Sequence, residues 1–178
     1  MSDIAFITDG TAAVVGLIVG LIDMSVNHCP NEGCLAKNNV TAYNTVSIGE
    51  TYFQDTHQGE EIYYRRDMGK ARGPFQKNWG FSATTDGEFW IGMGHSYTTN
   101  VFNERVFLQF HSMAGLYENG NGRDLGGAIQ FRSGIELGYQ ARNGVRVGLS
   151  VDHRSNAGLN SRNPGLETVQ LRVSIPIK

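Results

Sequence analysis

The sequence lacks the basic excess that nucleic-acid-binding proteins need. Its 15 Lys and Arg are outnumbered by 17 Asp and Glu, which gives a formal net charge of -2. A chain without net positive charge has no electrostatic footprint for phosphate backbones, so we do not expect a nucleic-acid partner. Metal-ligand spacing is lacking as well, because His57, His95 and His111 lie on separate segments. We therefore expect no metal and no other cofactor.

Cysteine is nearly absent, and the two that occur, Cys29 and Cys34, are close neighbours in the sequence. Two thiols alone do not complete a metal site, and His28 is the one nearby candidate for a further ligand. In an oxidising compartment the pair would form a small-loop disulfide, whereas in a reducing compartment both thiols would stay free. The sequence leaves both states open.

An apolar run of transmembrane length is also missing. The uninterrupted apolar stretch, residues 12–22, is shorter than the ~20 residues of an ordinary spanning helix. It has the length of a signal-peptide core, but Asp3 and Asp9 precede it where Lys or Arg is expected. Gly16 and Gly20 form a GxxxG pair, which allows close helix contact in lipid. Three interpretations stay open: an atypical signal segment, a membrane-associated helix, and a strand that joins the fold. We favour the helix.

Helix-favouring runs are scarce after residue 40, and apolar and polar side chains alternate instead. Such alternation is the pattern of strands with one apolar and one polar face. We expect eight strands, over residues 41–53, 60–66, 75–84, 88–99, 106–116, 127–139, 145–155 and 167–177. The charged segment 67–73 is expected to be a solvated loop. The chain would then consist of an N-terminal segment, residues 1–40, and an eight-stranded antiparallel barrel over residues 41–178.

A histidine, a serine and a glutamate share one face where the last two runs meet. His153 and Ser155 continue the odd-numbered apolar series of the first run, and Glu167 opens the odd-numbered series of the second. A serine hydroxyl becomes a nucleophile when a base takes its proton and a third group orients the base. Asn156 and Gly158 add an amide and a bare backbone N–H, the donors that an oxyanion hole needs. A cluster of solvated turn residues would give the same spacing.

The segment His153-Arg154-Ser155-Asn156-Ala157-Gly158, followed by Asn163-Pro164-Gly165 and Glu167, resembles the catalytic segment of the outer-membrane lipid A 3-O-deacylase family. The resemblance implies a small barrel in the outer membrane of a Gram-negative bacterium, which hydrolyses the acyl ester at position 3 of lipid A in lipopolysaccharide. It also implies that Ser155 is the nucleophile, His153 the general base and Glu167 the orienting acid. Asn156 and the Gly158 backbone would hold the oxyanion. The close match covers about the last quarter of the chain.

The membrane and soluble versions of such a barrel differ in which face of the strands lies inside. In a membrane barrel the apolar face contacts lipid and the polar face fills the interior. The polar faces here carry Arg132, Glu136, Asp152 and Arg172, which suit a narrow interior held by ion pairs. They would also suit the solvated outer face of a soluble ligand-binding barrel. We expect a membrane barrel with a polar interior, because it places the three residues where membrane lipids reach them.

A non-enzymatic alternative is a barrel that serves as a structural subunit of a membrane assembly. The unusual residues 1–40 favour it, since they could contact a membrane-protein partner and form only an atypical export signal. The end of the chain also favours it, because outer-membrane barrels of this kind commonly finish on an aromatic residue and this chain finishes on Lys178. This alternative predicts that the protein hydrolyses no acyl ester.

Overall fold

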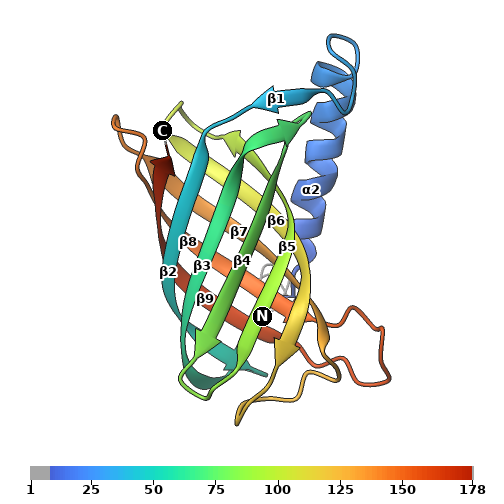
Figure 1. Cartoon of the computed structure of the whole chain (residues 1–178), viewed down its shortest axis with the longest axis vertical. Helices are drawn as coiled ribbons and strands as arrows, with labels where there is room; N and C mark the ends of the chain where they lie inside the picture. Colours follow the sequence, from blue (N-terminus) through green and yellow to red (C-terminus); the bar gives the residue numbers. More distant parts are fainter. Residues whose placement is uncertain (1–8, 178) are drawn as a thin grey trace.

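The computed structural model describes residues 9–177, so Asp3 and Lys178 lie outside the described part of the chain. It consists of a β-barrel with a helix against its outer wall (Figure 1). The barrel strands are β2 Ala42–Phe53, β3 Thr56–Arg72, β4 Phe75–Thr84, β5 Phe89–Asn100, β6 Val106–Glu118, β7 Ile129–Gln140, β8 Arg146–Ser155 and β9 Leu166–Ile177. Each of the predicted alternating runs therefore forms a strand.

Each barrel strand pairs antiparallel with the next strand in the chain. β9 then pairs back onto β2, from Ala42 opposite Ile177 to Tyr52 opposite Glu167, and this pairing closes the sheet into a cylinder. A further short strand, β1 Lys37–Asn39, adds to the end of β3. The predicted all-β, eight-stranded antiparallel barrel is thus confirmed.

β3 is longer than the sequence pattern predicts. It extends to Arg72 and includes most of the charged segment 67–73, so the expectation of a solvated loop there is wrong. Asp67 is 1% exposed inside the barrel, where it pairs with Arg65 at 3.1 Å. An irregularity between Asp67 and Ala71 shifts the register with β4. Such a shift breaks the two-residue alternation by which a strand is recognised in a sequence.

The polar faces of the strands point into the barrel. Arg132 Nη2 lies 2.7 Å from Glu61 Oε1, and Arg132 Nε lies 2.7 Å from Asp152 Oδ2. Arg172 contacts the same Asp152 oxygen at 2.6 Å. All four side chains are at most 1% exposed. Because buried charges are tolerated when they are paired and hydrogen-bonded, interlocking ion pairs can fill much of the interior, beside a cluster of buried aromatic and apolar side chains.

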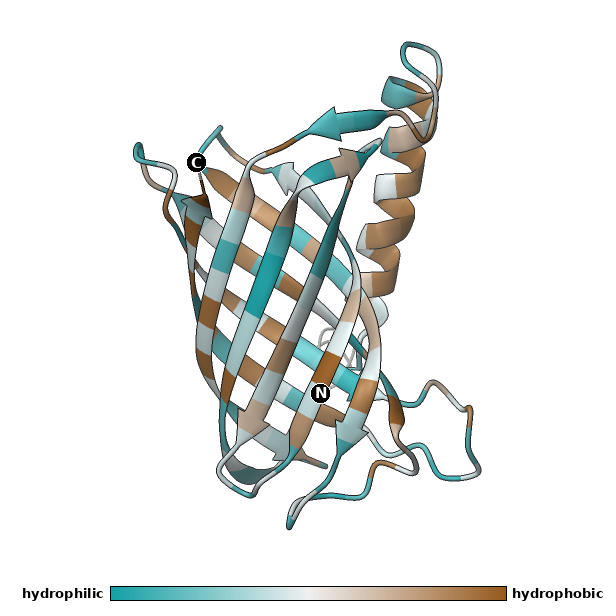
Figure 2. Cartoon of the chain, viewed as in Figure 1, coloured by the Kyte–Doolittle hydropathy of each residue, from teal (hydrophilic) through white to brown (hydrophobic). Residues whose placement is uncertain are grey.

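The apolar faces of the strands point outward. Ile62 and Leu149 are each 64% exposed, and Ile175 is 57% exposed. Figure 2 shows hydrophobic positions alternating with hydrophilic ones along the strands of the barrel wall. A wall of this kind around a charged interior suits lipid and not water. The fold is therefore a membrane barrel with a polar interior, and the soluble barrel that encloses a ligand with its apolar face is excluded.

Aromatic residues divide between the two sides of the wall. Tyr63, Trp90 and Tyr117 are buried inside, in one cluster with Leu125. The positions of these three residues on the strands turn their side chains inward, so they do not form an aromatic belt at the membrane surface. Trp79, by contrast, is 38% exposed on the outer wall.

The N-terminal apolar run forms helix α2, Thr11–Asp23, which continues as the π-helical turn η1, Met24–His28. The interpretation of this run as a strand is therefore wrong, and a helix forms. α2 packs against β5, β6 and β7 through a face of small residues that buries Ala13, Gly16 and Gly20. Together α2 and η1 are long and apolar enough to cross a membrane.

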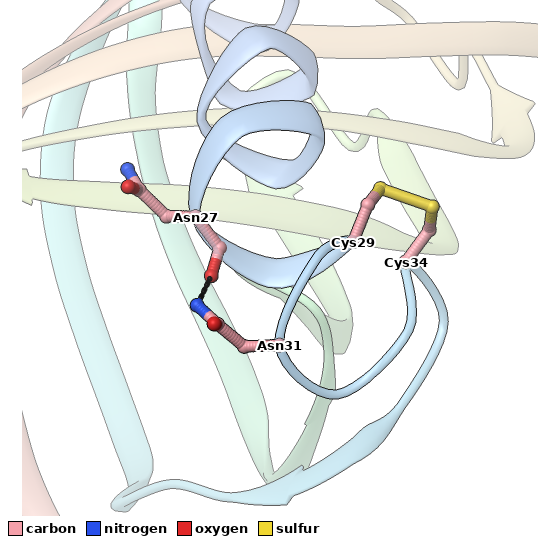
Figure 3. Close-up of a disulfide and its surroundings, with 4 residues drawn as sticks. All are labelled: Asn27, Cys29, Asn31 and Cys34. Carbon is pink, nitrogen blue, oxygen red and sulfur yellow. Dashed lines mark hydrogen bonds between the residues drawn. A yellow bond between two sulfur atoms is a disulfide. The ribbon is translucent and has the colours of Figure 1, made fainter.

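A short loop connects η1 to β1 at one rim of the barrel. Cys29 and Cys34 form a disulfide across this loop (Figure 3). Beside it, Asn31 Nδ2 donates a hydrogen bond to the backbone oxygen of Asn27 at 2.9 Å. The loop thus holds the end of the helical segment next to the start of the sheet.

Candidate active site

His153 and Glu167 are brought together by the pairing of β8 with β9. They are direct partners in the register of the two strands, and both side chains leave the outer face of the wall. His153 Nδ1 lies 3.2 Å from Glu167 Oε1, and the two side chains are 14% and 24% exposed. A carboxylate at Nδ1 favours the tautomer with its proton on that nitrogen, which leaves Nε2 free to act as a base.

Ser155 lies two positions after His153 on β8, so both side chains leave the same face of the strand. It is half-buried and lines the same cleft as His153. The His153 ring is hydrogen-bonded to Glu167 and, within residues 9–177, not to Ser155. Catalytic hydrogen bonds are often long without substrate and shorten in the complex. The arrangement therefore supplies an oriented base beside a hydroxyl.

The cleft over Ser155 has a volume of about 390 Å³ and lies on the outer wall of the barrel. Strands β6, β7 and β8 form one side of it, and the start of α2, with Thr11 and Val14, forms the other. Phe131, which is opposite Ser155 in the β7–β8 register, contributes apolar surface. A second hydroxyl, that of Ser133, lines the same cleft. The cleft is therefore open to membrane lipids along an apolar wall.

A row of polar residues interrupts the apolar wall in line with His153. His95 of β5 is opposite Ser112 of β6, Ser112 is opposite Ser133 of β7, and Ser133 is opposite His153. The sequence prediction identified His153 and missed Ser112 and Ser133. Each of these residues could have been noticed in the sequence as a polar position within an otherwise apolar alternating series. These interruptions form a row only once the register between the strands is known.

The proposed oxyanion donors are engaged within the protein. Asn156 is fully buried, and its Nδ2 donates to the backbone oxygens of Leu125 at 3.0 Å and of Arg162 at 2.6 Å. The Gly158 backbone N–H donates to Asn156 Oδ1 at 2.9 Å, and the Asn156 backbone N–H donates to Asn163 Oδ1 at 2.9 Å. In this arrangement Asn156 organises the loop after β8. Its role as an oxyanion donor stays a prediction, and it requires some of these bonds to open.

The other histidines are dispersed over the molecule. His111 is fully buried inside the barrel, with Nε2 3.5 Å from Asp152 Oδ2, whereas His57 packs edge-on against Tyr52 near one rim. No group of three or more His, Cys, Asp or Glu side chains in residues 9–177 is placed to hold a metal ion.

These observations define a class of protein: a membrane β-barrel that carries a His–Glu pair and a neighbouring serine on its lipid-facing wall. The chain belongs to the lipid A 3-O-deacylase (PagL) family, whose sequence model matches residues 42–176. The match covers the barrel, including His153, Ser155 and Glu167, and leaves α2 and the disulfide loop outside.

The proteins similar to the chain include two curated relatives and one solved structure. It is 30% identical over 95 residues to lipid A deacylase PagL of Bordetella bronchiseptica, which covers 52% of this chain and 53% of the relative. It is 40% identical over 55 residues to lipid A deacylase PagL of Pseudomonas aeruginosa, covering 31% and 32% of the two chains. The aligned segments thus span about half of the first relative and a third of the second. The crystal structure of the outer membrane enzyme PagL superposes with a TM-score of 0.60 at 20% identity, over 76% of this chain and 99% of that chain.

Proposed function

We propose that this protein is a lipid A 3-O-deacylase of the outer membrane of a Gram-negative bacterium, with Ser155, His153 and Glu167 as its catalytic triad. The observation that carries the proposal is the 3.2 Å contact between His153 and Glu167 beside Ser155, on a chain whose barrel belongs to the deacylase family. The substrate is lipopolysaccharide, and the reaction is hydrolysis of the ester-linked acyl chain at position 3 of its lipid A.

Ser155 Oγ attacks the carbonyl carbon of the ester while His153 Nε2 accepts the hydroxyl proton. The tetrahedral intermediate collapses, the bond from the acyl carbon to the sugar oxygen breaks, and His153 returns the proton to that oxygen. A water molecule then attacks the acyl-enzyme, with His153 again as base, and the fatty acid leaves as Ser155 is restored. Glu167 stabilises the imidazolium that forms in both steps. Donors at Asn156 and Gly158 would stabilise the negative oxygen once the loop hydrogen bonds that engage them open.

The position of the site on the outer wall supports a lipid substrate. The wall around it is apolar, with Val147 and Leu149 preceding His153 on the same face of β8 and exposed by 47% and 64%. An acyl chain held in the membrane meets this wall without entering water. The apolar wall beside the serine therefore favours esters whose acyl chains are held in the membrane.

The experiment that tests the proposal is mass spectrometry of lipid A after incubation with the purified protein in detergent micelles. We expect the wild-type protein to remove one ester-linked acyl chain and the Ser155→Ala variant to remove none. Ser133→Ala tests the other hydroxyl of the cleft, which lies directly opposite His153. If Ser155 is the nucleophile, Ser133→Ala should still release the acyl chain, whereas Ser155→Ala should not.

A Ser155→Ala variant that deacylates lipid A at the wild-type rate would refute the assignment of the nucleophile. If Ser133→Ala were inactive and Ser155→Ala active, the nucleophile would be Ser133 of β7. A wild-type protein that hydrolyses no acyl ester would favour the alternative of a structural subunit in a membrane assembly.

A further inference from the structure

Helix α2 is seated on the barrel wall through its two spaced glycines. A Cβ atom at Gly16 would lie 2.1 Å from Phe110 Cδ1, and one at Gly20 would lie 2.8 Å from Tyr97 Cγ. The rings of Tyr97 and Phe110 stack with centroids 6.5 Å apart and form the surface on which the helix lies. The GxxxG pair thus brings the helix backbone close to an aromatic surface of the same chain. The position of α2 on the wall is therefore fixed by close packing.

One flank of α2 faces a groove along this wall. Val14, Leu17, Leu21 and Met24 follow one another at intervals of three and four residues, which places them on the same flank of the helix. Val14 lines the cleft that contains His153 and Ser155, and the other three line a second cleft of about 410 Å³.

The two clefts meet at Ser112. This residue of β6 lines both of them, and it is the outward-facing neighbour of His95 on one side and of Ser133 on the other. The second cleft continues from Ser112 between Leu17 and Phe75 toward the loop at Leu35. The cleft along α2 therefore adjoins, at Ser112, the cleft in which an ester carbonyl would meet Ser155.

The dimensions and lining of the groove suit one hydrocarbon chain. Met24 follows Val14 by ten positions in the sequence, which at 1.5 Å per residue is about 15 Å along the helix. That length is half of the ~30 Å hydrocarbon core, the depth that one acyl chain occupies in one leaflet. Leu17, Leu21 and Phe75 provide apolar surface on both sides of the groove.

We propose that α2 forms the second wall of the acyl-chain site and sets which chain lengths are accepted. The chain to be cleaved would place its carbonyl at Ser155 and run between α2 and the strands β5 to β7 toward Met24. This inference rests on the proposed deacylase function and adds a determinant that lies outside residues 42–176, the segment that the family model matches. A chain longer than the groove would have to bend out into lipid, and a shorter one would leave apolar surface unfilled.

The test compares two tryptophan substitutions on adjacent residues of the full-length protein. Leu17→Trp fills the groove, whereas Ile18→Trp adds the same side chain at a neighbouring position that is 50% exposed and lines neither cleft. Hydrolysis is measured with a short-chain and a long-chain ester of the same alcohol. We expect Leu17→Trp to lower kcat/KM for the long-chain ester by about 10-fold or more and to leave the short-chain rate unchanged. Ile18→Trp should change neither rate.

The inference is overturned if Leu17→Trp and Ile18→Trp have the same ratio of long-chain to short-chain activity as the wild type. It is also overturned if the intact mass of the active protein from outer membranes shows that residues 9–28 are absent. These results differ from failure of the proposed function, in which the wild-type protein hydrolyses neither ester. The inference is supported if the active protein retains α2 and if Leu17→Trp, but not Ile18→Trp, lowers the ratio of long-chain to short-chain activity.

Discussion

At the scale of single residues, the chemistry of the candidate site depends on a pair that the strand register creates. His153 and Glu167 are fourteen positions apart in the sequence, yet their side chains are 3.2 Å apart because β8 and β9 pair at this point. The carboxylate is 24% exposed, which leaves it partly shielded from water. Its interaction with an imidazolium should therefore be stronger than that of a surface ion pair.

Glu167→Gln removes this negative charge and keeps the shape of the side chain. We expect kcat to fall by about 10²- to 10⁴-fold, because the imidazolium loses its counter-charge and the imidazole its preferred tautomer. The measurement is the steady-state rate of ester hydrolysis in micelles. Glu50→Gln, on the neighbouring strand β2, is the control and should retain full activity. If Glu167→Gln hydrolysed the ester as fast as Glu50→Gln, Glu167 would not belong to the triad.

Arg132 holds the interior of the barrel through two carboxylates, Glu61 and Asp152, at 2.7 Å each. Arg132→Met leaves both acids short of a buried counter-charge, and we expect it to lower the free energy of unfolding by about 3–5 kcal/mol. Arg162→Met is the matched control, since Arg162 pairs with Asp124 on the surface with side chains 68% and 60% exposed. That change should cost about 0–1 kcal/mol.

Urea unfolding in lipid vesicles, followed by tryptophan emission, measures both variants. If Arg132→Met and Arg162→Met lowered the free energy of unfolding by the same small amount, the interior would be hydrated and its ion pairs would contribute little to stability.

At the scale of elements, α2 shows how small residues determine where a helix lies. Gly16→Leu would place side-chain atoms into the ring of Phe110 and should displace the helix from the wall. Val15→Leu adds volume on the neighbouring position, which is 45% exposed, and should leave the helix in place. Spin labels on Ile22→Cys of α2 and Met93→Cys of β5 report the distance between helix and barrel.

We expect Gly16→Leu to lengthen or broaden the distribution of this distance and Val15→Leu to leave it unchanged. An unchanged distribution in Gly16→Leu would show that close packing at this glycine does not hold the helix.

At the scale of the whole molecule, the outward apolar wall predicts where a charge can be tolerated. Leu149 and Leu159 are similarly exposed, at 64% and 60%, but Leu149 lies on the wall in β8 and Leu159 lies in the loop after it. Leu149→Arg should lower stability in lipid vesicles by about 2–4 kcal/mol, because the charge enters the hydrocarbon region. Leu159→Arg should be close to neutral.

The same urea titration in vesicles compares the two variants. If both substitutions were neutral, the wall would face water and the assignment of the fold to a membrane would fail.

The faces of the barrel strands could be predicted from the sequence alone, as could the placement of His153, Ser155 and Glu167 on one of them. These features follow from the two-residue period of a strand, which is a local property and can be read from one chain segment at a time. The eight strands and their antiparallel order could be predicted for the same reason. The bounds of β3 could not, because a register shift between Asp67 and Ala71 breaks the period.

Which residues of different strands meet could be learned from the three-dimensional arrangement and not from the sequence. The contact of His153 with Glu167, the row from His95 to Ser133, and the burial of Asn156 all depend on register and closure, which are set by hydrogen bonds between distant segments. The place of α2 on the outer wall is decided in the same way, since an apolar run with two glycines specifies a helix surface and not its partner. The local two-residue period therefore determines which side of the barrel wall a side chain occupies, and the long-range pairing of strands determines which side chains lie next to it.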